Sequence, residues 1–365
     1  MRIAFDHQTF VWQPYGGISR YFTRLAQGLL DMAQQVEIFA PLHQNIYLAE
    51  LPHGVVRGRH VERYPPKTGR LLMTGNQLVS RFQIAEYRPD VVHETYYSKS
   101  GTAARTCPTV ITVLDMIHEL FPGACPDSGS TIARKRMAIG RADHVICISE
   151  HTRSDLMRLY DIADTRVSVI HLGFDRFASR EEASRADKSR PYVLYVGQRS
   201  GYKNFKGLLE AMAGSPRLMA DFNVIAFGGG GFSAAEQALI SALGFREGQV
   251  LHKTGDDGML GGLYRLARAF VYPSLYEGFG IPPLEAMAQN CPVVSSNTSS
   301  MPEVIGNAGE YFDPTSSEDM RCAIERVVYS DERIEWLRRA GAERLSAFSW
   351  AKCARETLDV YRSMA

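Results

Sequence analysis

Short runs rich in valine and isoleucine alternate along this chain with segments whose apolar residues recur at helical spacing. Each run is apolar on both faces, as strands are when helices cover both sides of a parallel sheet. The predicted strands form two series: residues 2–6, 36–40, 90–94, 109–115, 144–149 and 167–173, and then residues 192–197, 222–229, 249–255, 269–274 and 291–296. The pattern therefore predicts an α/β protein with two doubly wound sheets.

A polar, charged stretch, SREEASRADKSR, separates the two series and is closed by Pro191, which is typical of a linker. At 365 residues the chain is also longer than one hydrophobic core usually supports. The last segment reads as one amphipathic helix with Trp350, Leu358 and Tyr361 as apolar anchors. The predicted parts are a first domain over 1–178, a linker over 179–190, a second domain over 191–345 and a C-terminal helix over 346–365.

Charge and composition argue against several classes of protein. The formal net charge of +1 gives no bulk electrostatic case for nucleic-acid binding. The start, MRIAFDHQTF, lacks the apolar region of a signal peptide, and no stretch approaches the roughly 18 apolar residues of a membrane span. The six cysteines are scattered without a CxxC pair. We therefore expect free thiols, a cytoplasmic location and no metal site.

Glycines and cations follow predicted strands, where ligands of doubly wound sheets bind. Gly16 and Gly17 directly precede a helix, whose free N–H groups attract phosphate, although a plain strand-to-helix turn is the alternative. In VGQRSGYKNFKGLLEAM, Arg199 and Lys203 could clamp a diphosphate, unless they are two solvated surface cations. The four glycines of AFGGGGFSAAEQAL lack the GK[ST] of a P-loop, so tight-turn packing competes with ligand contact.

The strongest motif is PSLYEGFGIPPLEAMA, in which Glu277 and Glu285 flank a rigid turn with few side chains. Proline suits the first turn of the helix that follows. Carboxylates in these positions can accept hydrogen bonds from the hydroxyls of a sugar and a ribose, while backbone N–H groups meet phosphate. The alternative is that Glu285 complements the helix dipole and Glu277 is an ordinary surface acid.

Taken together, these segments resemble a family 4 retaining glycosyltransferase of the GT-B fold over nearly the whole chain. The motifs that carry the resemblance are EGFGIPPLE, GQRSGYKN, ISEHTRSDL, IHLGFD, PSLYEGFG, SSMPEVIGNAGEYFDP and FSWAKCARETLDVY. The resemblance implies two Rossmann-like domains facing a central cleft, with the C-terminal helix crossing back to the first domain. It also implies a nucleoside-diphosphate sugar as donor substrate, no cofactor and no metal.

The resemblance assigns the site residue by residue. The implied catalytic residues are Glu277, Arg199, Lys203 and Asp115, and the implied donor-binding residues are Gly17, Lys253, Thr254, Phe279, Gly280 and Glu285. Glu277 is expected on the donor sugar's hydroxyls, Glu285 on the ribose, and Arg199 with Lys203 on the diphosphate. Gly17 is expected over the phosphates. The other four donor-binding positions are expected near the base or along the turn.

One position departs from the family pattern. Leu114 stands where members often carry a histidine before an aspartate, here Asp115, and that histidine touches the donor sugar near its 6-hydroxyl. One hypothesis is that Leu114 faces the methyl group of a 6-deoxyhexose. The alternative is that Leu114 packs in the sheet and that His118 or His93 makes the polar contact to sugar or acceptor.

We expect a hexosyltransferase that moves a mannose-type or rhamnose-type sugar, GDP-linked, to a surface polysaccharide or lipid-linked glycan. The segment STIARKRMAIGRADH carries Arg134, Lys135, Arg136 and Arg141, which could meet a lipid diphosphate or an anionic membrane, or form a solvated helix face. Peripheral association with the inner face of the plasma membrane is therefore a further expectation. The rival functions are a GT-B nucleotide-sugar 2-epimerase and a catalytically silent sugar-binding protein.

Overall fold

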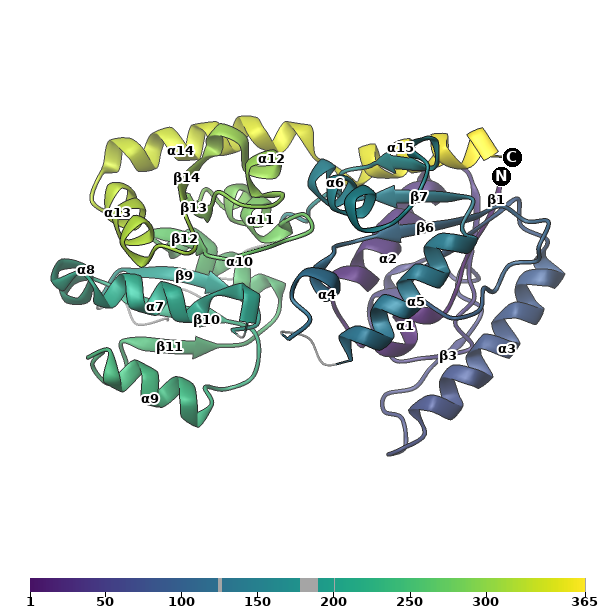
Figure 1. Cartoon of the computed structure of the whole chain (residues 1–365), viewed down its shortest axis with the longest axis horizontal. Coiled ribbons are helices and arrows are strands. Elements are labelled where there is room, and N and C mark those ends of the chain that lie inside the picture. The colour runs from purple at the N-terminus through teal and green to yellow at the C-terminus, as the bar shows by residue number, and fades with distance from the viewer. Residues whose placement is uncertain (124–126, 178–189, 200, 365) are drawn as a thin grey trace. The chain divides into compact units, whose positions relative to one another are not determined.

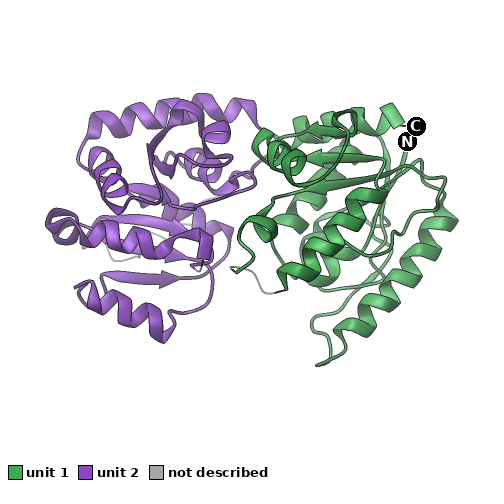
Figure 2. Cartoon of the chain, in the orientation of Figure 1, with its two compact units in different colours: residues 1–173, 349–365 green, residues 174–348 purple. Residues whose placement is uncertain are grey.

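The computed structural model describes residues 1–123, 127–177, 190–199 and 201–364. They form two compact units, one made of Met1–Gly173 with Ser349–Ala365 and the other of Phe174–Phe348 (Figure 2). The predicted domain limits at 178 and 346 differ from these divisions by a few residues and stay predictions. Nearly all of the predicted linker, 179–190, lies outside the described residues.

The first unit is built on a six-stranded parallel sheet in the order β2-β1-β5-β6-β7-β8. Its strands are β1 (Arg2–Phe5), β2 (Gln35–Ile38), β5 (Val91–Glu94), β6 (Thr109–Val113), β7 (His144–Cys147) and β8 (Val167–Val169). Its helices are α1 (Gln8–Trp12), α2 (Gly17–Asp31), α3 (Gly69–Tyr87), α4 (Ile117–Leu120), α5 (Ser128–Arg141), α6 (Glu150–Leu159) and α15 (Trp350–Met364). A separate pair, β3 (Leu42–His43) and β4 (Arg59–His60), lies outside this sheet.

The second unit has a six-stranded parallel sheet in the order β11-β10-β9-β12-β13-β14. Its strands are β9 (Tyr192–Val196), β10 (Asn223–Phe227), β11 (Val250–Lys253), β12 (Ala269–Tyr272), β13 (Val293–Ser296) and β14 (Gly309–Phe312). Its helices are α7 (Phe205–Ala213), α8 (Pro216–Asp221), α9 (Ala234–Ala242), α10 (Asp257–Leu266), α11 (Ile281–Ala288), α12 (Met301–Ile305), α13 (Ser317–Val328) and α14 (Asp331–Arg344).

Both sheets have helices on their two faces (Figure 1), so the predicted α/β class with two doubly wound sheets is confirmed. The physical reason is visible in the strands: β6 and β10 are buried at every residue, which requires cover on both sides. The sequence did not predict β14, whose residues GEYF include a glycine and a glutamate and lack the apolar pattern of the other strands.

The C-terminal helix α15 belongs to the first unit, where it packs along α2. A Cβ on Gly28 of α2 would lie 2.6 Å from the Cβ of Ala354, so glycine allows the two helices to approach closely. Leu358 and Tyr361, two of the predicted anchors, are buried, and Trp350 is partly buried. The predicted return of the tail to the first part of the chain is therefore confirmed.

Candidate functional site

The order of the second sheet decides where its ligand site lies. Counted from β9, the strands run 3-2-1-4-5-6, so the direction of winding reverses between β9 and β12. In open α/β sheets ligands bind at the carboxyl ends of strands beside such a switch point. The loops that follow β9 and β12 are the segments containing Lys203 and Glu277.

Lys203 and Glu277 meet at this switch point. The Lys203 Nζ lies 2.6 Å from the Glu277 Oε1, and the Ser274 hydroxyl donates to the same oxygen at 2.6 Å. The two charged side chains are 18% and 10% exposed. Burial and then the neighbouring Glu277 charge raise the pKa of Tyr272 well above its ordinary value. The structure thus holds a cation and a carboxylate together at the edge of the sheet.

The turn after Glu277 is locked by the loop that follows β13. The Ser299 hydroxyl oxygen accepts from the Glu277 N–H at 3.0 Å. The Ser300 hydroxyl donates to the carbonyls of Glu277 and Phe279, at 2.9 and 2.8 Å. Gly280 ends the turn with φ +104°, a conformation that favours glycine. These bonds leave little freedom to the backbone between the two glutamates of the motif.

Helix α11 begins immediately after Gly280 and carries Glu285 on a buried face. Its first residues, Ile281, Pro282 and Pro283, match the predicted proline-rich first turn. Burial and then the charge of Glu285 raise the pKa of Tyr264 well above its ordinary value. Glu285 is therefore a nearly buried carboxylate inside the unit, which weakens the alternative that it serves only the helix dipole.

Arg199 has a role that its sequence position did not reveal. Its guanidinium donates to the carbonyls of Gly228, Gly230 and Gly231, and its Nε donates to Glu236 at 2.7 Å. The side chain is only 6% exposed. Although burial opposes the charge of Glu236, its bonds to Arg199 and Ser233 hold its pKa below the ordinary value. Arg199 therefore fastens the glycine-rich loop after β10, and a direct diphosphate contact stays a prediction.

The glycine-rich loop and the end of β11 lie together. The Gly228 N–H donates to the Lys253 carbonyl at 3.0 Å. Lys253 is partly exposed and Thr254 exposed, so both side chains can reach a ligand from this edge. Gly228 and Gly229 have φ of +93° and +67°, which are conformations that favour glycine. The backbone of the loop therefore requires these glycines whether or not a ligand binds there.

In the first unit, Leu114, Asp115 and His118 follow the carboxyl end of β6 and are each partly buried. Asp115 Oδ1 accepts from the Ile117 N–H at 3.1 Å. Burial and a cationic neighbour, Lys135, oppose protonation of His118 more than Asp115 favours it, so its pKa is lowered. These residues stand at an edge where a ligand can be bound, which is where the sequence predicted them.

His93 lies elsewhere, inside the core of the first unit, and it is 0% exposed. Its Nδ1 lies 2.6 Å from the Tyr361 hydroxyl and its Nε2 lies 2.9 Å from the Thr112 hydroxyl. In this conformation both ring nitrogens are engaged, which does not support the predicted contact of His93 with sugar or acceptor. Its geometry is that of a core residue that joins β5, β6 and α15.

Gly17 begins α2, and a Cβ at this position would meet no atom within 4 Å. The helix start is therefore open, as phosphate contact requires. Close by in the same unit, a pocket of about 300 Å³ is lined by residues of α1, α2 and α5 and by the segment after β5. Its lining residues are Thr9, Trp12, Gln13, Ile18, Tyr96, Asp127, Thr131 and Arg134.

The basic residues of the segment 130–144 are largely engaged within the first unit. Lys135 is fully buried and lies 2.9 Å from the Glu119 carboxylate. Arg141 binds the Glu94 carboxylate, and Arg134 donates to the Ser130 carbonyl and hydroxyl. Lys135 and Arg141 are therefore structural, whereas Arg136 is exposed beside the Tyr160 ring and Arg134 bonds to Ser130 of its own helix, so a contact of α5 with a lipid diphosphate or a membrane stays a prediction.

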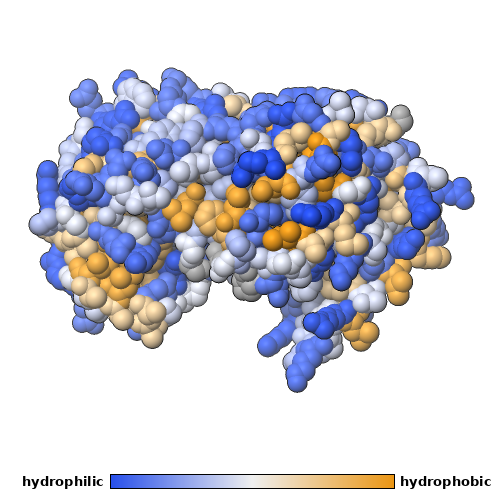
Figure 3. All heavy atoms as spheres, in the orientation of Figure 1, coloured by the Kyte–Doolittle hydropathy of each residue, from blue (hydrophilic) through white to orange (hydrophobic). Residues whose placement is uncertain are grey.

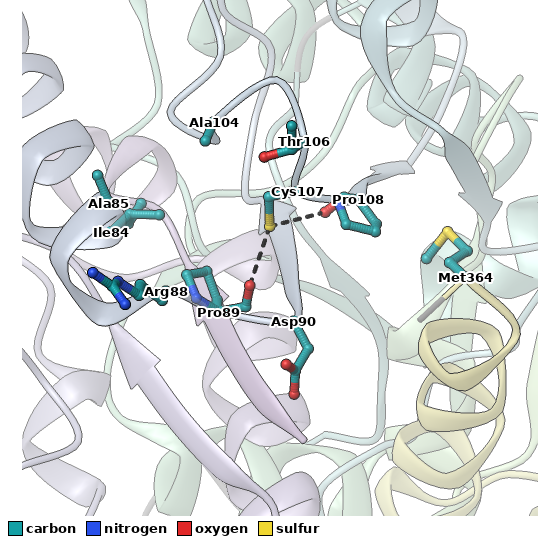
Figure 4. Close-up of a pocket in the computed structure, with 10 residues that line it drawn as sticks. All are labelled: Ile84, Ala85, Arg88, Pro89, Asp90, Ala104, Thr106, Cys107, Pro108 and Met364. Carbon is teal, nitrogen blue, oxygen red and sulfur yellow. Dashed lines mark hydrogen bonds between the residues drawn. The ribbon is translucent and has the colours of Figure 1, made fainter.

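A larger pocket of about 530 Å³ lies at the opposite, amino-terminal end of the first sheet (Figure 4). Pro89 and Asp90 precede β5, and Cys107 and Pro108 precede β6. Figure 4 shows the Cys107 thiol donating to the Pro89 and Pro108 carbonyls. Burial raises the pKa of this thiol, so the pocket offers no activated nucleophile.

Sequence reasoning missed the serines of the site. Ser274, Ser299 and Ser300 come from the ends of two strands, and their importance depends on which loops meet in space. The run SSNTSS, which begins with the last two residues of β13, was the available signal. It also missed Asp6, which accepts from the backbone and hydroxyl of Thr95 at the corresponding switch point of the first sheet.

The described part of the chain also bears on the predictions about metal, membrane and cysteines. None of its His, Cys, Asp and Glu side chains gather in a group of three that could hold a metal ion. Among the same residues, no helix has both the length and the apolar character needed to cross a membrane. The described cysteines are free thiols, while Cys125, like Ser200 of the GQRSGYKN motif, lies outside the described residues.

Comparison with known proteins identifies the two halves separately. Residues 15–176 match the family model "Glycosyltransferase Family 4", and residues 176–344 match "Glycosyl transferases group 1". The O-antigen chain mannosyltransferase B of Escherichia coli is 26% identical over 99% of this chain and 100% of its own length. The alpha-maltose-1-phosphate synthase of Mycolicibacterium smegmatis is 30% identical over the full length of both chains.

Among solved structures, the sucrose-phosphate synthase of Thermosynechococcus elongatus is similar over 100% of this chain and 99% of its own, with a TM-score of 0.78 and 19% identity. At that identity the likeness shows the fold alone, which is the GT-B architecture that the motifs implied.

Proposed function

The chain belongs to glycosyltransferase family 4, and on that premise we propose that it transfers a mannose-type hexose from a GDP-sugar, with retention of anomeric configuration. The acceptor in this proposal is a growing surface polysaccharide or lipid-linked glycan. The observation that carries the proposal is the Lys203–Glu277 pair at the switch point of the second sheet. A binding site for an anionic donor needs a cation there, and a hexose needs an acceptor for its hydroxyls.

Each part of the donor has a counterpart at this edge of the sheet. Glu277 takes the hexose hydroxyls, Lys203 the diphosphate and Glu285 the ribose. The turn at Phe279 and Gly280 offers backbone N–H groups to the middle of the donor. The remaining predicted donor residues are Gly17 for the phosphates and Lys253 and Thr254 for the base. Metal ions and cofactors have no part in the proposal.

The proposed reaction needs electrostatic help more than a dedicated base. The bond from the anomeric carbon to the diphosphate oxygen breaks, and the bond to the acceptor oxygen forms on the same face. Positive charge develops on the sugar ring and negative charge on the diphosphate, which Lys203 stabilises. The acceptor's proton passes to the leaving phosphate. In this proposal Arg199 acts by fixing the glycine-rich loop. Asp115 is the catalytic residue proposed from the first unit.

The names of the relatives support a sugar transferase but do not agree on which sugar is transferred. One relative is named for mannosyl transfer and another for maltose-1-phosphate synthesis, so family 4 membership by itself does not choose the sugar. We favour mannose as the sugar. In that case Leu114 packs in the sheet, and His118 makes the polar contact to the sugar or the acceptor. A GDP-activated 6-deoxyhexose such as GDP-rhamnose is the competing donor. A clear preference for GDP-rhamnose over GDP-mannose would assign Leu114 to a methyl group.

The 300 Å³ pocket of the first unit is the proposed acceptor site. It combines two aromatic side chains, Trp12 and Tyr96, with the polar side chains of Gln13, Asp127 and Arg134. Aromatic faces pack against sugar rings while polar groups fix orientation, which is the usual make-up of a small-molecule site. The proposal locates the reaction on the cytoplasmic side, with peripheral attachment to the inner face of the plasma membrane.

The experiment is a transfer assay joined to a thermal-shift panel of nucleoside diphosphates and their sugars. A donor at 100 times its Kd should stabilise the protein by about 2.7 kcal/mol. Lys203→Ala should lower kcat about 100-fold or more, as loss of an electrostatic stabiliser does. Lys206→Ala is the matched control, because Lys206 lies on α7, 69% exposed, and pairs only at 3.5 Å with Glu210. Its activity should stay within about twofold of the wild type.

Other outcomes would replace the proposal. If no nucleotide or nucleotide sugar shifts the melting temperature, the proposed glycosyltransferase function is refuted. Exchange of the sugar's configuration without acceptor would indicate the 2-epimerase. A Glu277→Ala protein with wild-type activity in cells would indicate a silent sugar-binding protein.

A further inference from the structure

Helix α3 presents a stripe of apolar residues to solvent, while the face that it turns to the protein carries the buried polar residues Asn76 and Ser80 together with the buried Ile84. Leu71, Leu78 and Phe82 are 74%, 65% and 71% exposed, and Val79 is also exposed. The three most exposed residues are spaced by seven and four positions, so they form one stripe along the helix. A helix that covers a core normally shows the reverse arrangement, and contiguous exposed apolar surface usually marks a binding surface.

Specific bonds hold α3 in this orientation. The Asn76 side chain accepts from the Leu42 N–H at 2.8 Å, and the Ser80 hydroxyl donates to the Phe39 carbonyl at 2.9 Å. The Gln77 amide donates to the carbonyls that follow β5, at 3.1 and 3.2 Å. Both Asn76 and Ser80 are buried. Turning the apolar stripe inward would break these bonds and leave buried polar groups without partners, so the outward stripe is a built feature.

Basic residues accompany the stripe. Arg70 and Arg81 are exposed on α3, eleven positions apart and therefore on the same side of the helix, next to the apolar stripe. Arg63 and Lys67, just before the helix, are exposed as well. Within the described part of the chain none of these four cations forms an ion pair. In the space-filling view, the region over α3 at the lower right shows apolar and charged residues side by side (Figure 3).

The apolar stripe and its basic neighbours favour one partner for this surface over another. An apolar stripe beside arginine and lysine side chains suits the boundary between the headgroups and the acyl chains of an anionic bilayer. A second copy of the chain would bring two basic surfaces together, which like-charge repulsion opposes. Two of the basic residues of α5 that the sequence had suggested for the membrane, Lys135 and Arg141, are engaged inside the first unit.

We propose that α3 is the membrane-contact element of this protein. Leu71, Leu78 and Phe82 lie at the acyl boundary of an anionic bilayer, and Arg70 and Arg81 lie among its phosphate headgroups. The inference rests on the proposed function in one respect, which is that the proposed function includes peripheral attachment to a membrane. The test of the inference does not require sugar transfer.

The test measures binding of the full chain to vesicles of phosphatidylglycerol and phosphatidylethanolamine, with phosphatidylcholine vesicles as the uncharged comparison. The wild type should bind the anionic vesicles, and binding should fall as salt rises. Leu78→Glu with Phe82→Glu should weaken it at least tenfold. Arg70→Glu with Arg81→Glu should weaken it to a similar degree at low salt. Both pairs are exposed, so melting temperature and nucleotide binding should not change.

Leu266→Glu is the matched control, because it makes the same exchange at an exposed leucine of the second unit and should bind vesicles like the wild type. Wild-type binding by the Leu78→Glu, Phe82→Glu protein, or no binding of the wild type to anionic vesicles, would overturn the inference. So would a wild-type dimer that these two changes convert to a monomer, since the stripe would then be an interface between copies. Transfer assays on a soluble acceptor separate the two proposals: active protein without vesicle binding defeats this one alone, and vesicle binding without transfer defeats the proposed function alone.

Discussion

Gly280 is the residue at which backbone geometry and ligand geometry meet. Its φ of +104° disfavours any side chain, and a Cβ there would lie 3.0 Å from the Met301 Cε and 3.3 Å from its Sδ. We predict that Gly280→Ala costs about 1–3 kcal/mol of unfolding free energy, because the turn must strain or shift. Donor affinity should fall as well, since the shifted turn carries the backbone N–H groups proposed to meet the donor.

Chemical denaturation and donor titration measure the two effects. Gly140→Ala is the control: it is an exposed glycine inside α5, and a Cβ there would meet no atom within 4 Å. That change should be neutral or stabilising by up to about 1 kcal/mol. Equal stability of the Gly280→Ala and wild-type proteins would contradict the argument from strain.

Lys203 and Glu277 show what a residue's position in the chain can and cannot convey. Both were predicted from motifs that follow strands. Their separation of 2.6 Å became visible only when β9 and β12 were found as neighbours in the sheet. The pairing also bears on chemistry, because a carboxylate already bound to a lysine is suited to hold hydroxyls and poorly suited to act as a nucleophile.

At the scale of elements, the loop after β10 depends on one side chain from the loop after β9. Arg199 is nearly buried and donates to three glycine carbonyls and to Glu236. We predict that Arg199→Ala lowers the stability of the ligand-free protein by about 1–3 kcal/mol, because three loop carbonyls and the partly buried Glu236 carboxylate lose their partner. Arg199→Lys should recover only part of this, since lysine lacks the planar fork.

Melting of the ligand-free variants provides the measurement, and a double-mutant cycle with Glu236→Gln tests the coupling. The two changes should be clearly non-additive, because each removes the Arg199–Glu236 ion pair. If Arg199→Ala melts like the wild type yet loses turnover, the arginine acts directly on the diphosphate, and the loop-fastening role is refuted.

At the scale of the whole molecule, the tail helix is tied to the sheet of the first unit through His93. This ring contacts Tyr361, which lies 268 positions later in the chain, and packs edge-on against Phe22. Burial lowers the pKa of His93 to about 3. The neutral ring is therefore the folded form, and its protonation opposes folding.

The sign of the pH effect follows from that shift. The unfolded ring titrates at about 6.5, so the stability that His93 contributes is complete above this pH and is lost as pH falls from 6.5 towards 3. At pH 5 the loss from this group should be about 2 kcal/mol. The pH dependence of unfolding free energy in His93→Gln should therefore be flatter by about that amount between pH 7 and pH 5. Parallel curves for the two proteins would show that His93 does not bear the acid sensitivity.

Most of the fold could be read from the alternation of apolar runs and helices, because strands buried on both faces leave a pattern that depends on local residues alone. The sequence did not disclose β14, because this edge strand is buried by β13 and by helices α13 and α14 rather than marked by an apolar run. The sequence did not disclose the outward apolar stripe of α3 for a related reason. Its polar residues find partners on Leu42 and Phe39, which no helical periodicity can disclose.

The sequence by itself determined the α/β class, the two series of strands, the amphipathic tail helix and the two glutamates around a glycine turn, while the return of the tail was implied by the family resemblance. These depend on the side chains of neighbouring residues and on backbone demands that glycine and proline mark. Only the tertiary structure decided that Lys203 meets Glu277, that Arg199 fastens a loop, that His93 belongs to the core and that α3 faces outward. Each of these joins residues far apart in the chain, and the order of strands in a sheet, which brings them together, is a property of packing that no local pattern carries.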